Sequence, residues 1–434
     1  MKKLITATFF LLFIFCGNFY GVASNNDGSQ NKDTSKVYFF IKKELNTGVY
    51  FSGSNEREEI RTDESKQNEE RFTGSAGFQF ENRIWNYLSY KQEFIDLTLD
   101  IGPFFGVGSW SDSTSLQMVD GDQTTVGLRS KLAVDYSSRF YYDDRNYTLV
   151  KVNAWVRDDL FHQSIDGATQ DSSENWSDFD EKGLDNKFRY GFSANAGWGM
   201  GKLNPMNHYM VADYLLNKYY KGRLFSDEEI ERLANKITEL KLQRDPSLEK
   251  NYDAELSEIV DFLRTSMFLA NPEIPQTDWE LGEFMPRLSG SRLELGPFFN
   301  YYNREPDFYY GGFMQYDRAK YVNTSWNSNF SINLSYNHYK HHDWATLESN
   351  IGWTYYPNLK SQFGFGLKYI PGVVIYDWDE FDPVKHNFIP YIEYYRQVNS
   401  KTRVNFSFAW KIGDGEEFMM TGPEFSLAIY KSRY

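Results

Sequence analysis

The sequence predicts an all-β fold: a transmembrane antiparallel barrel of about 14 strands (about 12–16) with an inserted subdomain of amphipathic helices. Aromatic residues make up 18% of the 434-residue chain, although its mean hydropathy is −0.61 and 24% of its residues are charged. Disordered chains are poor in aromatic residues, so this composition excludes disorder. No run of about 18 apolar residues follows the N-terminal leader, which excludes a helical membrane protein. Strands with one apolar and one polar face reconcile many aromatic rings with a polar average.

The first 24 residues have the features of a secretory signal peptide. Two lysines precede an apolar stretch at 4–15, and small residues follow at 21–24. The only cysteine, Cys16, lies in this leader, so the exported part contains no disulfide bond. The bulky Phe15 before it disfavours lipoprotein cleavage. A net charge of −14 makes nucleic acid a poor partner. The sequence therefore predicts an exported protein, with a short N-terminal tail at 25–35.

Apolar and polar residues alternate with a period of two over most of the exported chain. Soluble sandwiches and propellers alternate as well. The alternating segments here are longer than the usual five or six residues and match the nine to eleven that a tilted membrane strand needs. Tyrosine and tryptophan concentrate near their ends, as at a bilayer interface. We expect six strands in 36–200, near 36–52, 71–82, 93–108, 123–137, 146–157 and 188–200. We expect eight in 286–434, near 286–303, 307–317, 322–338, 344–356, 361–377, 386–397, 402–411 and 419–433.

Strand parity assigns the connecting segments to the two sides of the membrane. Short turns follow even-numbered strands, whereas 54–70, 109–122 and 158–187 are long, follow odd-numbered strands and are expected to be outer loops. The segment 201–285 follows the sixth strand and is therefore placed on the side of the termini. Between 203 and 272 the apolar period changes to that of helices, with a capping box at Ser226. These helices are too rich in charge to span lipid.

Three roles are open for this helical insert. It can be a cap that packs on itself and on the barrel mouth, a plug that enters the lumen, or a docking surface for a partner. A docking surface predicts that tyrosines of the insert stay exposed after folding. The four tyrosines concerned are Tyr209, Tyr214, Tyr219 and Tyr220.

With an export signal, alternating strands, no cysteine in the exported part and a terminal aromatic residue, Tyr434, the chain resembles the outer-membrane β-barrel (porin-like) proteins of Gram-negative bacteria over 36–200 and 286–434. The resemblance implies location in the outer membrane, contact with its lipid, insertion by the barrel assembly machinery, an insert facing the periplasm and a barrel-closing strand that ends at Tyr434. It names no subfamily. The family's closing strand has apolar residues at every second position before the last. Here Ala428 and Tyr430 keep that register and Ser432 breaks it, while Phe425, Leu427 and Ile429 lie on the opposite parity.

The residues expected to line the lumen carry both signs of charge. Such a set can line a narrow aqueous path, and it can equally fill a sealed barrel with ion pairs; fourteen strands fall between the filled and the open sizes. The cations are Arg129, Lys131, Lys151, Arg292, Lys368 and Arg403, and the carboxylates are Asp96, Asp100, Asp135 and Glu294.

The acidic outer segments offer a second kind of site, because carboxylate clusters suit Ca²⁺ or Mg²⁺. No segment has the ligand spacing of an EF-hand calcium loop, so solvated acidic loops are the simpler interpretation. Imidazoles at one hairpin offer a weak transition-metal site. The candidates are Asp377, Asp379, Glu380 and Asp382 for the first and His338, His341 and His342 for the second.

The sequence contains no Gly-x-Ser-x-Gly motif, no His-Glu-x-x-His motif and no glycine-rich phosphate-binding loop, and no catalytic residue is assigned. The leading hypothesis is a passive porin-like channel for small solutes. The alternative is a closed barrel that binds an envelope or surface partner through its insert or acidic loops, and a barrel enzyme is third.

Overall fold

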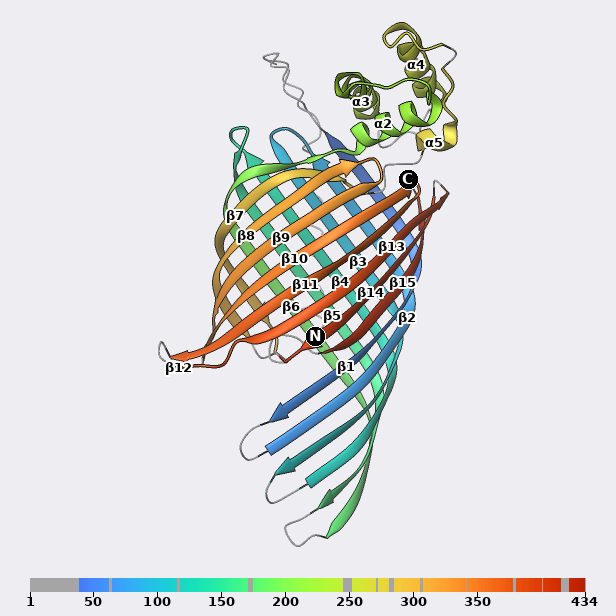
Figure 1. Cartoon of the computed structure of the whole chain (residues 1–434). Helices are drawn as coiled ribbons and strands as arrows, with labels where there is room; N and C mark the ends of the chain where they lie inside the picture. The colour runs from blue at the N-terminus through green and yellow to red at the C-terminus, as the bar shows by residue number, and fades with distance from the viewer. Residues whose placement is uncertain are drawn as a thin grey trace, which may run out of the picture. The chain divides into compact units, whose positions relative to one another are not determined.

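The structure is a computed structural model that describes residues 39–61, 65–114, 118–170, 175–244, 252–270, 272–280, 285–304, 307–340, 342–377, 380–399, 401–414 and 421–433. The expected signal peptide and tail lie outside these residues. Fourteen strands form a closed antiparallel barrel: each pairs with its neighbours in chain order, and β1 pairs with β15 (Figure 1). Of the fifteen strands, β12 (Glu380–Phe381) only extends β11, which pairs directly with β13. The predicted fold class and strand number are thereby confirmed.

The strands of the barrel differ in length between its two halves. The first six have 22 to 30 residues: β1 (Phe40–Arg61), β2 (Ser65–Tyr87), β3 (Lys91–Thr114), β4 (Met118–Tyr141), β5 (Asn146–Gln170) and β6 (Trp176–Pro205). The other eight have 11 to 17: β7 (Leu288–Tyr302), β8 (Phe308–Asn323), β9 (Trp326–His338), β10 (Asp343–Asn358), β11 (Ser361–Asp377), β13 (Lys385–Asn399), β14 (Thr402–Gly413) and β15 (Gly422–Ser432).

The expectation that 54–70, 109–122 and 158–187 are loops was wrong for most of their residues. The strands run on through them and stay paired up to the hairpin ends, for example Arg61 with Lys66. Because β15 pairs with β1 only as far as Ser54, with one further bridge at Arg57, and β7 pairs with β6 only from Gly191 onward, the six strands continue as an open sheet beyond the closed barrel (Figure 1). Polar and charged residues fall on both faces of this sheet, so no one-sided apolar pattern marked it in the sequence.

The outward face of the barrel is apolar and exposed, and its inward face is polar. On β15 the exposed Phe425 and Ile429 alternate with the buried Ala428 and Tyr430, which settles the register of the closing strand; Tyr434 lies outside the described residues. Apolar side chains gain nothing from facing water, so an apolar exterior of this extent indicates a lipid surround. Further exposed outward residues are Phe78, Ile101, Phe105, Val126, Leu128, Leu295, Met314, Leu334, Ile351, Leu367, Ile392 and Phe406.

Four helices, α2 (Asn207–Tyr219), α3 (Asp227–Leu242), α4 (Tyr252–Thr265) and α5 (Gln276–Glu280), lie between β6 and β7. Ser226 and Glu229 form the predicted capping box of α3. The apolar faces of the helices pack into one core that includes the fully buried Trp279. The four tyrosines whose exposure would have indicated a docking surface are all partly buried against this core. They are Tyr209, Tyr214, Tyr219 and Tyr220. Among the described residues, no helix is long and apolar enough to cross a membrane.

The insert packs on the barrel end that carries the even-numbered turns. Leu359, in the turn between β10 and β11, is buried in the core of the insert. Arg287 donates hydrogen bonds to the backbone carbonyls of Asn323, Thr324 and Trp326 at 2.6, 2.7 and 2.9 Å, which joins the end of the insert to the β8–β9 turn. The insert is therefore anchored to β8 through β11.

Candidate functional site

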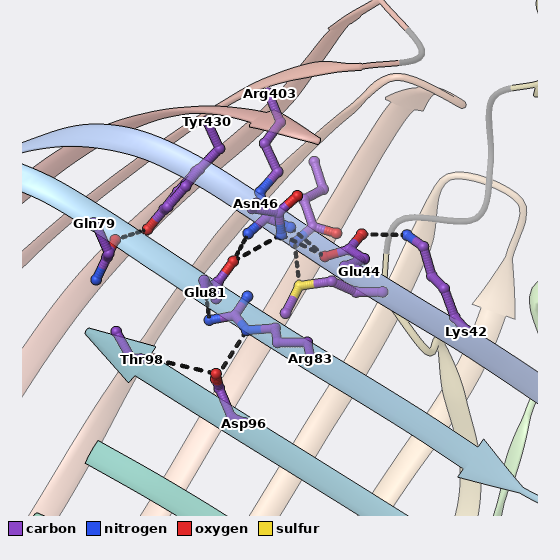
Figure 2. Close-up of polar contacts among 12 residues, drawn as sticks. Lys42, Glu44, Asn46, Gln79, Glu81, Arg83, Asp96, Thr98, Arg403 and Tyr430 are labelled. Carbon is purple, nitrogen blue, oxygen red and sulfur yellow. Dashed lines mark hydrogen bonds and ion pairs between the residues drawn. The ribbon is translucent and has the colours of Figure 1, made fainter. Parts of the chain in front are cut away.

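The inward face of the barrel carries three groups of charged residues, and the first joins the two ends of the strand order. Arg403 on β14 pairs with Glu44 on β1 at 2.5 Å and with Glu81 on β2 (Figure 2). Arg83 pairs with Glu81 at 2.6 Å and with Asp96 on β3 at 2.9 Å. Arg403 is 5% exposed and Glu81 is 1% exposed. The group satisfies its own charges and fills the space beside the closing strands.

The second group surrounds Glu294 on β7, which is fully buried. Its carboxylate lies 2.6 Å from Arg139 Nε, 2.7 Å from Lys151 Nζ and 3.4 Å from Arg292 Nε. Arg292 also pairs with Asp317 on β8 at 2.8 Å. The structure thus brings three predicted lumen residues, Lys151, Arg292 and Glu294, into one network. Arg139 was missed, although continuing the alternation of 123–137 by one step would have placed it inward.

The third group lies at the end of the barrel opposite to the insert. Asp159 on β5 accepts from Arg129 on β4 at 2.9 Å and pairs with Arg157 at 2.6 Å. Arg189 on β6 lies directly opposite Arg157 in the strand register. Only Arg129 was predicted, because Arg157 closes an expected strand, Asp159 falls in an expected loop and Arg189 was not read as a lumen residue.

The remaining predicted lumen residues lie beside these groups, and Lys131 stands opposite Arg157 in the strand register. Lys131 and Asp135 point inward from β4 and are exposed. On β11, Lys368 lies 3.8 Å from Glu348 of β10, and the two side chains are each 41% exposed. Asp100, on β3, faces Lys131 in the register. Inward-facing charges with this exposure contact water, whereas the ion pairs around Arg403 and Glu294 are buried.

The candidate metal residues are not gathered into a coordination sphere. The described ones make isolated contacts: His338 Nδ1 lies 2.7 Å from Asp343, and Asp382 accepts from Tyr376 at 3.2 Å. Asp377 and Glu380 are paired across β11 and β12, and His342 packs 5.8 Å from the ring of Trp344. In the described part of the chain no three His, Cys, Asp or Glu residues are placed to hold a metal ion. Asp379 and His341 lie outside the described residues.

Full closure, an apolar exterior and a charged interior define this chain as a membrane-spanning β-barrel, and it has the fold of outer-membrane barrels. No family model and no curated protein matches the sequence. Solved structures that are similar include the transport unit of the autotransporter AIDA-I from Escherichia coli, with 9% identity over 96% of this chain and 95% of that chain and a TM-score of 0.32. An outer membrane channel from Pseudomonas putida F1 is 9% identical over 93% and 99% of the two chains, with a TM-score of 0.31. The outer membrane protease OmpT from Escherichia coli is 9% identical over 92% and 97%, with a TM-score of 0.27. Similarities this low carry no information on activity.

Proposed function

We propose that the protein is a passive channel for small solutes in the outer membrane of a Gram-negative bacterium. The observation that carries the proposal is the exposure of the inward-facing Lys131, Asp135, Lys368 and Glu348. A sealed barrel would bury such groups in tight pairs, as happens around Glu294. Charges left in water within a closed barrel indicate an aqueous path.

The path is expected to be narrow and to run between the exposed charges of β4 and the wall formed by β9–β13. The buried ion pairs occupy part of the lumen beside β1–β8 and leave Lys131 and Asp135 of β4 exposed, whereas β9 presents Asn329, Ser331 and Asn333 inward, which are short and uncharged. The insert is anchored to turns of this second wall through Arg287 and Leu359. We therefore infer that the insert restricts the exit on its side, which we assign to the periplasm.

The test is planar-bilayer conductance of the refolded mature chain, using protein whose gel mobility shifts on boiling. Stable unitary steps are expected. The double variant Lys131→Glu/Lys368→Glu should shift the reversal potential toward cation selectivity, because it reverses two charges that face the path. The matched control is Lys182→Glu, on the open sheet outside the barrel, where the side chain is 56% exposed and pairs with Asp180 at 2.8 Å; selectivity should not change. Deleting 203–272 should raise the unitary conductance.

A folded barrel that gives no steps in either form would overturn the channel and favour the second candidate, a closed barrel that binds a partner. One observation favours this second candidate: the open six-stranded sheet extends past the closed barrel. Apart from one bridge between Arg57 and Thr421, its strand edges at 55–61 and 176–187 have a sheet neighbour on one side only among the described residues. Such edges pair with added strands in many complexes.

A further inference from the structure

The group of arginines at the outer end of the lumen contains more positive charge than its carboxylate can balance. Arg129, Arg157 and Arg189 face inward from β4, β5 and β6. Asp159, itself only 3% exposed, is engaged by Arg129 and Arg157. Arg157 and Arg189 stand directly opposite each other, an arrangement that destabilises a strand pair when the charges are alike.

Arg189 is the member of this group whose hydrogen bonding is incomplete. Its Nε atom is buried and has no hydrogen-bond partner in the described part of the chain. Arg304, in the loop after β7, is a further cation within electrostatic range of it. A buried donor without a partner costs free energy that a bound acceptor would recover. The natural acceptor for a guanidinium is a carboxylate, because its two oxygens can accept two parallel N–H hydrogen bonds from the guanidinium.

A row of aromatic rings begins beside these arginines on the same inward face. Trp155, two residues before Arg157, lies 6.3 Å from Tyr302 on β7, measured between ring centroids. The row continues from Tyr302 to Tyr309 at 6.1 Å and from Tyr309 to Trp344 at 4.9 Å. All four rings are half-buried, so each keeps part of its surface open to the lumen.

Gly191 leaves room for the contact between the rings of Trp155 and Tyr302. It lies between Trp155 and Tyr302 in the strand register, and a Cβ there would come within 2.6 Å of atoms of both rings. Aromatic rings beside an excess of positive charge suit a ligand that has both a flat ring and a negative charge, because ring stacking and ion pairing then act together.

We propose that the outer mouth of the lumen is a binding site for small organic carboxylates that carry a flat ring, with the carboxylate held by Arg157 and Arg189 and the ring against Trp155 and Tyr302. This inference rests on the proposed function only where it concerns transport, because there it names the class of solute that the channel would favour. Binding itself does not require conduction.

The test uses benzoate as the probe, with benzamide as the neutral ring of nearly the same shape and acetate as the anion without a ring. Binding to the folded, full-length mature protein in detergent is measured by calorimetry at low salt. Benzoate should bind at least tenfold more tightly than either comparison compound, as expected when an ion-paired hydrogen bond or a stacked ring is lost. The variants Arg189→Gln and Trp155→Leu should each weaken benzoate binding about tenfold.

The variant Arg189→Gln is chosen over Arg157→Gln because Arg157 pairs with Asp159, and its removal could disturb folding. Folding of each variant is checked by the gel shift on boiling. The matched control is Arg318→Gln, which removes the same charge from the exposed outward face of β8 and should leave binding unchanged. Equal binding of benzoate and benzamide, equal binding of benzoate and acetate, or an unaltered Arg189→Gln variant would overturn the site. A barrel that binds benzoate without conducting would keep the site and refute the channel, whereas conduction without benzoate binding would do the reverse.

Discussion

Replacing Glu294 by glutamine should be among the most destabilising single changes in the barrel. The substitution keeps the side-chain volume but removes the negative charge that lies within 2.6 Å of Arg139, 2.7 Å of Lys151 and 3.4 Å of Arg292. The carboxylate has no exposed surface, so water cannot take its place beside these cations. Breaking a buried ion pair by removing one partner costs about 3–5 kcal/mol. We expect Glu294→Gln to lower the free energy of unfolding by that amount.

The assay is urea unfolding of the protein refolded into lipid vesicles, followed by tryptophan fluorescence. The control is Glu348→Gln, the same chemical change at an inward-facing carboxylate that is 41% exposed and lies 3.8 Å from Lys368. An exposed pair contributes about 0–1 kcal/mol, so this variant should unfold close to the wild type. A loss below about 1 kcal/mol for Glu294→Gln, or equal losses in the two variants, would refute the view that this part of the lumen is sealed by ion pairing.

Three further predictions concern the helical insert. Ser226→Ala removes the capping hydroxyl of α3 and should lower hydrogen-exchange protection of that helix by about 1 kcal/mol, with α4 unchanged. Burial raises the pKa of Glu255, but hydrogen bonds from Arg244 and Trp279 outweigh the effect of burial and hold that pKa below its ordinary value. Its stabilising contribution is therefore present above the unfolded-state pKa and lost as the pH falls, so α4 should lose protection below about pH 4, and Glu255→Gln should abolish that dependence. Arg287→Gln removes three hydrogen bonds to the β8–β9 turn and should speed proteolysis of the insert while the gel shift of the barrel persists; the exposed Arg264→Gln on α4 should do neither.

The fold could be predicted because each strand that crosses the lipid has one apolar face. In 403–410, Val404, Phe406 and Phe408 alternate with polar residues, and the structure pairs this strand on both sides. The same signal was missing from 176–187, where charges fall on both faces, so the continuation of β6 could not be seen. Pairing with β5, which no local pattern reports, is what keeps that segment a strand.

The partners of the lumen residues were harder to predict than the residues themselves. Glu294 and Arg292 were both expected inward, but Arg139 stands 155 positions away in the chain from Glu294, and only the curvature of the closed barrel brings them together. Alternation fixes which face a side chain takes, and it leaves open how far along the strand its neighbours lie. Arg189 was missed because alternation alone does not show where along a strand the lumen ends.

The two walls of the lumen therefore have different tasks. The buried pairs of Arg403 with Glu44 and of Glu294 with Arg139 join strands that are far apart in the chain, which stabilises the closed barrel. The second wall, beside β9–β13, presents short and uncharged side chains on β9, namely Asn329, Ser331 and Asn333. The insert grips the turns of this second wall, through Leu359 and Arg287, and the row of rings ending at Trp344 reaches its opposite end. A solute that crosses this barrel would meet a site of selection at one end of the open wall and a restriction at the other, so affinity and flux can be altered by separate mutations.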